Sequence, residues 1–188
     1  MANTKIGIDR LDVWELMVDE DGSSLTNWTS LAGTWDTSGT YFTQANAGAS
    51  VMNMKFNTKM PLAISVYEAE VQCKTAGGTR RTGIYIMDGT TSNGGMLVYL
   101  QPDENWLCIE RGGHFLMATI SATIDLDTWY KIRLLVTGDT LSVWLDEVFL
   151  TSFPNVGGQV NTHSLHLYNY QSEGWFRNIK AWTLSLPA

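Results

Sequence analysis

The chain has 188 residues, 44% of them hydrophobic, and carries a formal net charge of −7, which fits one globular domain with its own core. Lys and Arg total 12 against 19 Asp and Glu, and only Arg80 and Arg81 are adjacent, so we expect neither nucleic acid nor an anionic membrane as a partner. No stretch reaches the roughly 18 apolar residues of a membrane helix, and two cysteines are too few for a disulfide framework or a zinc site.

Residues 1–20 are expected to form an N-terminal arm ahead of the domain. Leu11, Trp14 and Val18 are spaced as on a helix or an extended arm, and they are too apolar for a free tail. We therefore predict that the arm docks on another subunit or on the outside of the domain. No apolar segment typical of a signal peptide follows Met1, which indicates synthesis in the cytoplasm.

Apolar side chains at every second position predict a series of β-strands after the arm. The clearest pair is 130–136 and 141–145, in which Ile132, Leu134, Val143 and Leu145 share one face. The other predicted strands are 63–74, 82–87, 96–100, 106–110, 115–120, 148–150, 164–170 and 175–184. Turn residues recur about every ten positions, as in sandwiches and barrels. The fold class predicted for residues 21–188 is all-β, a single antiparallel β-sandwich.

Four motifs in one order resemble the concanavalin A-like lectin/glucanase family, which includes laminin-G-like and carbohydrate-binding jelly rolls. They are the opening Trp28 and Gly33-Thr34-Trp35, the central Gly83-Ile84-Tyr85, the hairpin 129–146, and the closing Gly174-Trp175-Phe176-Arg177-Asn178. Glu147 stands where the family pattern has Gly after the hairpin Asp. The resemblance implies a jelly roll, a fold that hosts lectins, hydrolases and structural modules.

No catalytic set is predicted. Glycosidases of this superfamily carry paired carboxylates on one strand, and the nearest pattern here, Glu68-Ala69-Glu70, lacks the remaining acids. Glu110 near His114 fits a turn better than an acid–base pair. His163 and His166 are three apart, so they face opposite sides of a strand and do not form a metal pair. We therefore expect no cofactor, with calcium at 19–22 left open by analogy with the family.

The two cysteines, Cys73 and Cys108, lie inside predicted strands. We expect them to be buried free thiols. A single bridge between them stays open if their strands are neighbours.

Aromatic side chains supply the candidate binding site. Sugar rings stack their C–H faces on Trp and Tyr, so aromatic residues on one sheet face would form a glycan-binding groove or, alternatively, a covered layer or protein interface. Strand parity selects Tyr85, Tyr99, Trp106, Trp144, His166, Tyr168 and Tyr170.

We expect a non-catalytic, lectin-like binding or assembly module. Because the domain stands alone without a signal or a catalytic partner, we place it on a virion surface, as a phage capsid-decoration or tail protein that binds glycans and neighbouring subunits. A stand-alone carbohydrate-binding protein and a glycoside hydrolase or lyase of the same fold are the alternatives.

Overall fold

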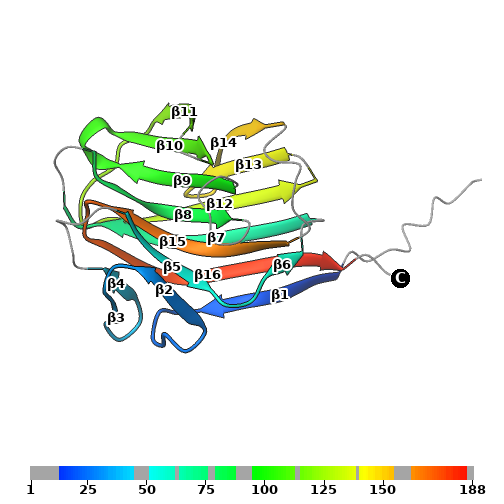
Figure 1. The fold of residues 1–188 in the computed structure, drawn as a ribbon. Coiled ribbons are helices and arrows are strands. Elements are labelled where there is room, and N and C mark those ends of the chain that lie inside the picture. Colours follow the sequence, from blue (N-terminus) through cyan, green and yellow to red (C-terminus); the bar gives the residue numbers. More distant parts are fainter. Residues whose placement is uncertain are drawn as a thin grey trace, which may run out of the picture.

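The computed structural model describes residues 13–44, 51–61, 64–75, 79–87, 95–112, 115–138, 140–154 and 162–185. Two antiparallel sheets stack on each other in this part of the chain (Figure 1). The prediction of an all-β sandwich is confirmed.

The first sheet, called the β7 sheet after its central strand, has a continuous path of seven strands. Their order is β14 (Val148–Phe153), β13 (Thr140–Leu145), β12 (Trp129–Thr137), β7 (Ile64–Cys73), β16 (Gly174–Ser185), β4 (Phe42–Gln44) and β3 (Trp35–Thr37). β1 (Val13–Glu20) pairs with the second half of β16. The chain therefore brings its first and last described strands together at one edge of the sandwich (Figure 1).

The second sheet, called the β8 sheet, also has a continuous path of seven strands. Its order is β11 (Phe115–Ser121), β10 (Trp106–Arg111), β9 (Gly95–Gln101), β8 (Arg81–Met87), β15 (Thr162–Tyr170), β5 (Val51–Phe56) and β2 (Trp28–Ala32). β6 (Met60–Pro61) pairs with β15, and a 3-10 turn, η1 (Pro102–Glu104), links β9 to β10. No described helix is long enough to cross a membrane.

The main core lies between the two sheets and follows the alternation seen in the sequence. Ile132, Leu134 and Val143 are fully buried and Leu145 is nearly so, which confirms the predicted facing of the hairpin. Each such side chain removes apolar surface from water at roughly 25 cal/mol per Å². The opposite positions Lys131 and Arg133 face solvent on the outer side of the β7 sheet and form ion pairs there.

The next turn, which joins β13 to β14, has positive φ at two non-glycine residues, Asp146 (47°) and Glu147 (65°). Two-residue hairpin turns of the primed types need positive φ, which Gly adopts without strain. Glu147 therefore holds the conformation that the family's Gly would take. Asp146 secures the turn by accepting a hydrogen bond from the Lys131 backbone N–H at 2.7 Å.

The predicted N-terminal arm is only partly described. Val13–Glu20 is β1, a strand of the β7 sheet, so the sandwich begins at Val13 rather than at residue 21. A register shift between Leu16 and Val18 changes which side chains face inward: Trp14 and Leu16 are exposed, while Val18 is 2% exposed and belongs to the core. Residues 1–12 lie outside the described part.

Both cysteines are buried free thiols, as predicted. Cys73 lies in the core on β7, whereas Cys108 lies on β10 in the other sheet, on the face that points away from the core. Their strands are not neighbours, which removes the bridge left open by the sequence.

Candidate functional site

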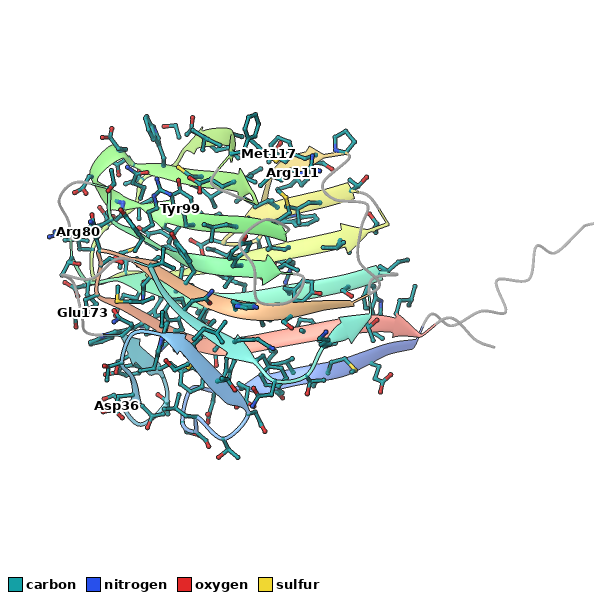
Figure 2. The ribbon with its side chains drawn as sticks, in the orientation of Figure 1. Asp36, Arg80, Tyr99, Arg111, Met117 and Glu173 are labelled. Carbon is teal, nitrogen blue, oxygen red and sulfur yellow. The ribbon has the colours of Figure 1, made fainter. Side chains whose placement is uncertain are left out.

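The outer face of the β8 sheet carries a second cluster of buried side chains, separate from the core. It contains Tyr85, Leu97, Tyr99, Cys108 and Tyr168, each at most 7% exposed. Strand register places these residues in rows: His166 pairs with Tyr85 and Tyr85 with Leu97, while in the next row Tyr168 pairs with Gly83 and Gly83 with Tyr99. Tyr99 is labelled on this sheet in Figure 2. An outward sheet face would ordinarily be solvated, so its burial marks it for closer inspection.

An ion pair between Arg81 and Glu110 lies on this face. Arg81 Nη1 donates to Glu110 Oε1 at 2.9 Å, and the Tyr99 hydroxyl donates to the same oxygen at 2.7 Å. The Arg81 guanidinium also lies over the ring of Tyr99, 4.7 Å from its centroid. The Glu110 side chain is 6% exposed, so two donors and a cation–π contact compensate a nearly buried carboxylate.

The pKa shifts in this group follow from burial and from these contacts. Burial and then the Glu110 hydrogen bond raise the pKa of the Tyr99 phenol. Burial alone would lower the pKa of Arg81, but the adjacent Tyr99 and Glu110 outweigh it and raise that pKa. Arg81 therefore remains charged at neutral pH.

His166 and Asn53 form a second polar pair on the same face. His166 Nδ1 lies 3.0 Å from Asn53 Oδ1, and the His166 ring is fully buried. With Asn53 Oδ1 as acceptor, Nδ1 carries the proton and Nε2 keeps its lone pair. Burial, with a smaller contribution from Lys55, lowers the pKa of His166 to about 3. The imidazole is therefore neutral at physiological pH.

Four buried polar atoms among the described residues of this face have no hydrogen-bond partner: Arg81 Nε, Ser164 Oγ, His166 Nε2 and the Tyr168 hydroxyl. A buried polar atom without a partner costs about 1–3 kcal/mol, and most such atoms in folded proteins are satisfied. Six more such atoms lie elsewhere in the described residues, so it is the position of these four near an ion pair that indicates a place where a polar ligand would complete the hydrogen bonding. Solvent reaches the cluster at Arg81, whose side chain is 21% exposed, and at the partly exposed Tyr170.

Gly83 lies on β8, between Tyr168 of β15 and Tyr99 of β9. A Cβ at this position would collide with the Val98 carbonyl oxygen and would lie 2.5 Å from Tyr99 Cα. Because Gly83 has no side chain, β8 approaches β9 closely where Gly83 pairs with Tyr99. The family-like Gly83-Ile84-Tyr85 motif thus has a local steric cause.

The structure brings most of the predicted binding residues together. Tyr85, Tyr99, His166, Tyr168 and Tyr170 share the outer face of the β8 sheet. Trp106 has the same parity as Cys108 and lies at the end of β10, 36% exposed.

Trp144 is the exception, and its predicted placement in the same groove is wrong. It lies on β13 of the β7 sheet, where it contacts Phe149 with the ring centroids 5.4 Å apart. Strand parity correctly turned Trp144 away from the core. Parity contains no information on which of two sheets a strand joins, and this caused the error.

The predicted aromatic groove is also more buried than the sequence indicated. Tyr85, Tyr99 and Tyr168 are almost covered, so their faces offer little area for a sugar to stack on. Buried polar atoms without a partner, rather than exposed aromatic faces, distinguish this site. Sequence reasoning missed Arg81 and Asn53, and it assigned Glu110 to a turn, whereas Glu110 lies inside β10 as a lone acid in an apolar run.

Apart from Glu110, the acids considered as catalytic or metal-binding alternatives lie elsewhere. Glu68 and Glu70 are on the outer face of the β7 sheet, in ion pairs with Arg133 at 3.0 Å and Arg177 at 2.7 Å. In the acidic turn, Asp21 accepts a hydrogen bond from the Ser23 backbone N–H. Across the described ranges, no three His, Cys, Asp or Glu side chains are close enough to hold a metal ion. His114 lies outside those ranges.

Solved structures of the same fold resemble the chain over most of its length. A carbohydrate-binding module CBM66 from Bacillus subtilis has a TM-score of 0.68 at 15% identity, covering 84% of this chain and 96% of that one. A Crh5 transglycosylase in complex with NAG has a TM-score of 0.69 at 12% identity, covering 91% and 85%. A putative glycosyl hydrolase from Parabacteroides distasonis has a TM-score of 0.66 at 15% identity, covering 87% and 91%. These similarities establish the fold.

No curated protein matches the chain in sequence. A family model does match, over residues 14–181, from the exposed tryptophan of β1 to the middle of β16. This range takes in both sheets and every residue of the polar cluster. The chain belongs to the family of 3-keto-alpha-glucoside-1,2-lyase-like domains.

Proposed function

We propose that the chain is a carbohydrate-binding module that holds its ligand on the outer face of the β8 sheet. The observation that carries this proposal is the presence of buried, unpartnered polar atoms on Arg81, His166 and Tyr168, three of the four described on this face. Membership of a family named for action on glucosides supports a saccharide as the ligand.

Sugar hydroxyls both donate and accept hydrogen bonds, which suits these three atoms. Arg81 Nε would donate to a sugar oxygen, His166 Nε2 would accept from a hydroxyl, and the Tyr168 hydroxyl would do either. The Arg81–Glu110 ion pair and the Asn53 contact hold the first two groups in place. A ligand that satisfies all three atoms would recover the cost of their burial, and preorganisation of this kind favours affinity.

The substitution Tyr168→Phe tests the proposal, because a structural and a binding role predict opposite effects. Removing an unpartnered buried hydroxyl leaves the free energy of unfolding unchanged or raises it. If the hydroxyl binds sugar, affinity falls by about tenfold, the equivalent of one lost hydrogen bond. Affinity is measured by calorimetry for a saccharide identified on a glycan array.

Phe115→Ala is the matched control, since Phe115 is 71% exposed at the β11 edge of the same sheet. It should leave affinity unchanged. Equal affinity of Tyr168→Phe and the parent protein would remove the outer face of the β8 sheet as the binding site.

Lyase chemistry is a second candidate, favoured by the free Nε2 lone pair of His166. In a 3-keto-glucoside the C2 proton is acidic because it is adjacent to the ketone. A base could take it while the C1–O bond breaks and the aglycone leaves. A histidine with a pKa of about 3 is a weak base at neutral pH, which is why we rank binding first.

Incubation with a 3-keto-glucoside separates the two candidates. NMR signals of a released aglycone, lost in His166→Gln while binding persists, would establish the lyase. Binding without turnover supports the non-catalytic module expected from the sequence.

The virion setting stays a prediction. We propose that the module acts on the surface of a capsid or tail, where a low-charge, aromatic-rich domain would contact host glycans. Immunogold labelling of purified particles checks this: label on the particle supports it, and particles free of the protein contradict it.

A further inference from the structure

The outer face of the β7 sheet, on the opposite side of the molecule from the polar cluster, holds a cavity of about 420 Å³. It is lined by Trp14, Val66, Glu68, Arg133 and Trp182. This volume falls within the range of small-molecule sites, roughly 300–1,000 Å³. The sequence analysis did not assign the cavity, and the proposed saccharide site does not include any residue that lines it.

Tryptophan is concentrated on this face. Five of the eight tryptophans of the chain have the outward parity of the β7 sheet: Trp14, Trp129, Trp144, Trp175 and Trp182. Trp129 and Trp175 are covered by neighbours, since Tyr41 stacks on Trp175 at 4.6 Å and Arg177 lies 4.2 Å from the Trp129 ring centroid.

Trp14 and Trp182 differ from these two. Neither ring makes a ring–ring or cation–π contact with another described residue, and Trp14 is 44% exposed. Register places them diagonally on adjacent strands, because Trp14 pairs with Leu184 and Leu16 pairs with Trp182. Both side chains line this open pocket, Trp14 from β1 and Trp182 from β16.

The two charged side chains that line the cavity, Glu68 and Arg133, have no net charge together. Glu68 accepts from Arg133 Nε at 3.0 Å, and a second carboxylate and ammonium, Glu147 and Lys131, extend the network. One lining carboxylate and one lining guanidinium cancel, so the site attracts neither anions nor cations strongly. The pair still presents an acceptor and a donor side by side, which suits the vicinal hydroxyls of a sugar.

We propose that this cavity binds a neutral pyranose, with the sugar's C–H faces against Trp14 and Trp182 and its hydroxyls on Glu68 and Arg133. Trp144 pairs with Arg133 on the next strand and borders the same face. This tryptophan, wrongly assigned to the other sheet from sequence, is placed to contact a second sugar unit of a longer glycan.

Indole N–H signals in a ¹H–¹⁵N NMR spectrum test the proposal directly. The two cavity signals are assigned with Trp14→Phe and Trp182→Phe, and the full chain is titrated with maltose, cellobiose and methyl α-mannoside. At least one sugar should shift the signals of Trp14 and Trp182. The core residues Trp28 and Trp35 are 6% and 8% exposed and serve as the unshifted reference in the same sample.

Affinity is then measured for that sugar. Trp14→Ala should weaken binding at least tenfold and leave the fold intact, since Trp14 is exposed at the edge strand. Phe115→Ala, an exposed aromatic on the other sheet, is the matched control and should leave affinity unchanged.

The outcome is separable from that of the proposed function. Sugar-induced shifts of Trp14 and Trp182 that persist in Tyr168→Phe establish a site independent of the β8 sheet. Signals that stay unshifted with all three sugars at tens of millimolar, or that shift only with protein concentration, overturn the proposal, and the second result would assign the face to self-association instead.

Discussion

At the scale of single residues, the buried His166 makes the stability of the folded chain depend on pH. Its pKa is about 3 in the folded chain against 6.5 for an ordinary histidine. In the unfolded chain His166 therefore takes up a proton near pH 6.5, whereas in the folded chain it is protonated only near pH 3. Stability is unaffected by this group above pH 6.5 and falls as the pH drops through this window, by on the order of 4–5 kcal/mol in total.

Urea denaturation of the parent protein and of His166→Gln checks this effect. Glutamine does not titrate, so the variant should lose less stability than the parent between pH 7 and pH 4. Carboxylates contribute the same slope to both proteins and cancel in the comparison. Identical pH dependence would mean that His166 is solvated or already charged in the folded state.

The Arg81–Glu110 pair gives a second prediction at this scale. Arg81→Ala removes the guanidinium from a carboxylate that is 6% exposed and keeps the hydrogen bond from the Tyr99 hydroxyl. Breaking a buried ion pair from one side costs about 3 kcal/mol or more. The double variant Arg81→Ala/Glu110→Gln should recover part of this loss, which thermal or urea denaturation measures. A double variant less stable than the single one would contradict the coupling.

At the scale of strands, Gly83 limits how β8 and β9 pair. A Cβ at Gly83 would meet backbone atoms of Val98 and Tyr99, which cannot rotate away as a side chain can. Gly83→Ala should therefore destabilise the fold by about 1–3 kcal/mol, measured by urea denaturation. Gly39→Ala is a weaker control, because a Cβ added there meets nothing, although its φ of +74° also disfavours alanine. A loss at Gly83 no larger than at Gly39 would refute the steric cause.

The β12–β13 hairpin provides a test of which side chains face the core. Ile132 and Val143 are fully buried between the sheets. Ile132→Ala should cost about 2–4 kcal/mol through lost transfer energy and a residual cavity. Leu31→Ala, at a position that is 42% exposed on β2, should cost far less. Comparable losses at the two sites would mean that the hairpin does not face the core.

Strand-level features were predictable from sequence for a physical reason. Side chains alternate with period two, so Tyr130, Ile132 and Leu134 identify a buried face without any knowledge of partners. The register shift at Met17 could not be predicted in this way, because a bulge interrupts the alternation and made Leu11, Trp14 and Val18 resemble a helix.

At the scale of the whole molecule, pairing between distant segments determines the sites. Arg81 and Glu110 are 29 residues apart and meet only because β8, β9 and β10 are neighbours. His166 meets Asn53 across 113 residues. Parity gave the outward facing of the aromatic residues, but the strand order that unites five of them and separates Trp144 is a property of the complete topology.

The N-terminal strand supplies the last prediction. From sequence, residues 1–20 were expected to form an arm that docks on another subunit or on the outside of the domain. In the structure, Val18 is buried in the core and β1 pairs with β16 from Val13 to Glu20. Deleting residues 1–20 therefore uncovers one edge of β16, opens the core and removes the Trp14 wall of the cavity. We expect a large loss of thermal stability from this deletion, whereas deleting residues 1–12 keeps β1 and should preserve both stability and the Trp182 indole response to sugar. Equal melting temperatures for the two deletions would show that β1 is dispensable, and would restore the arm expected from sequence.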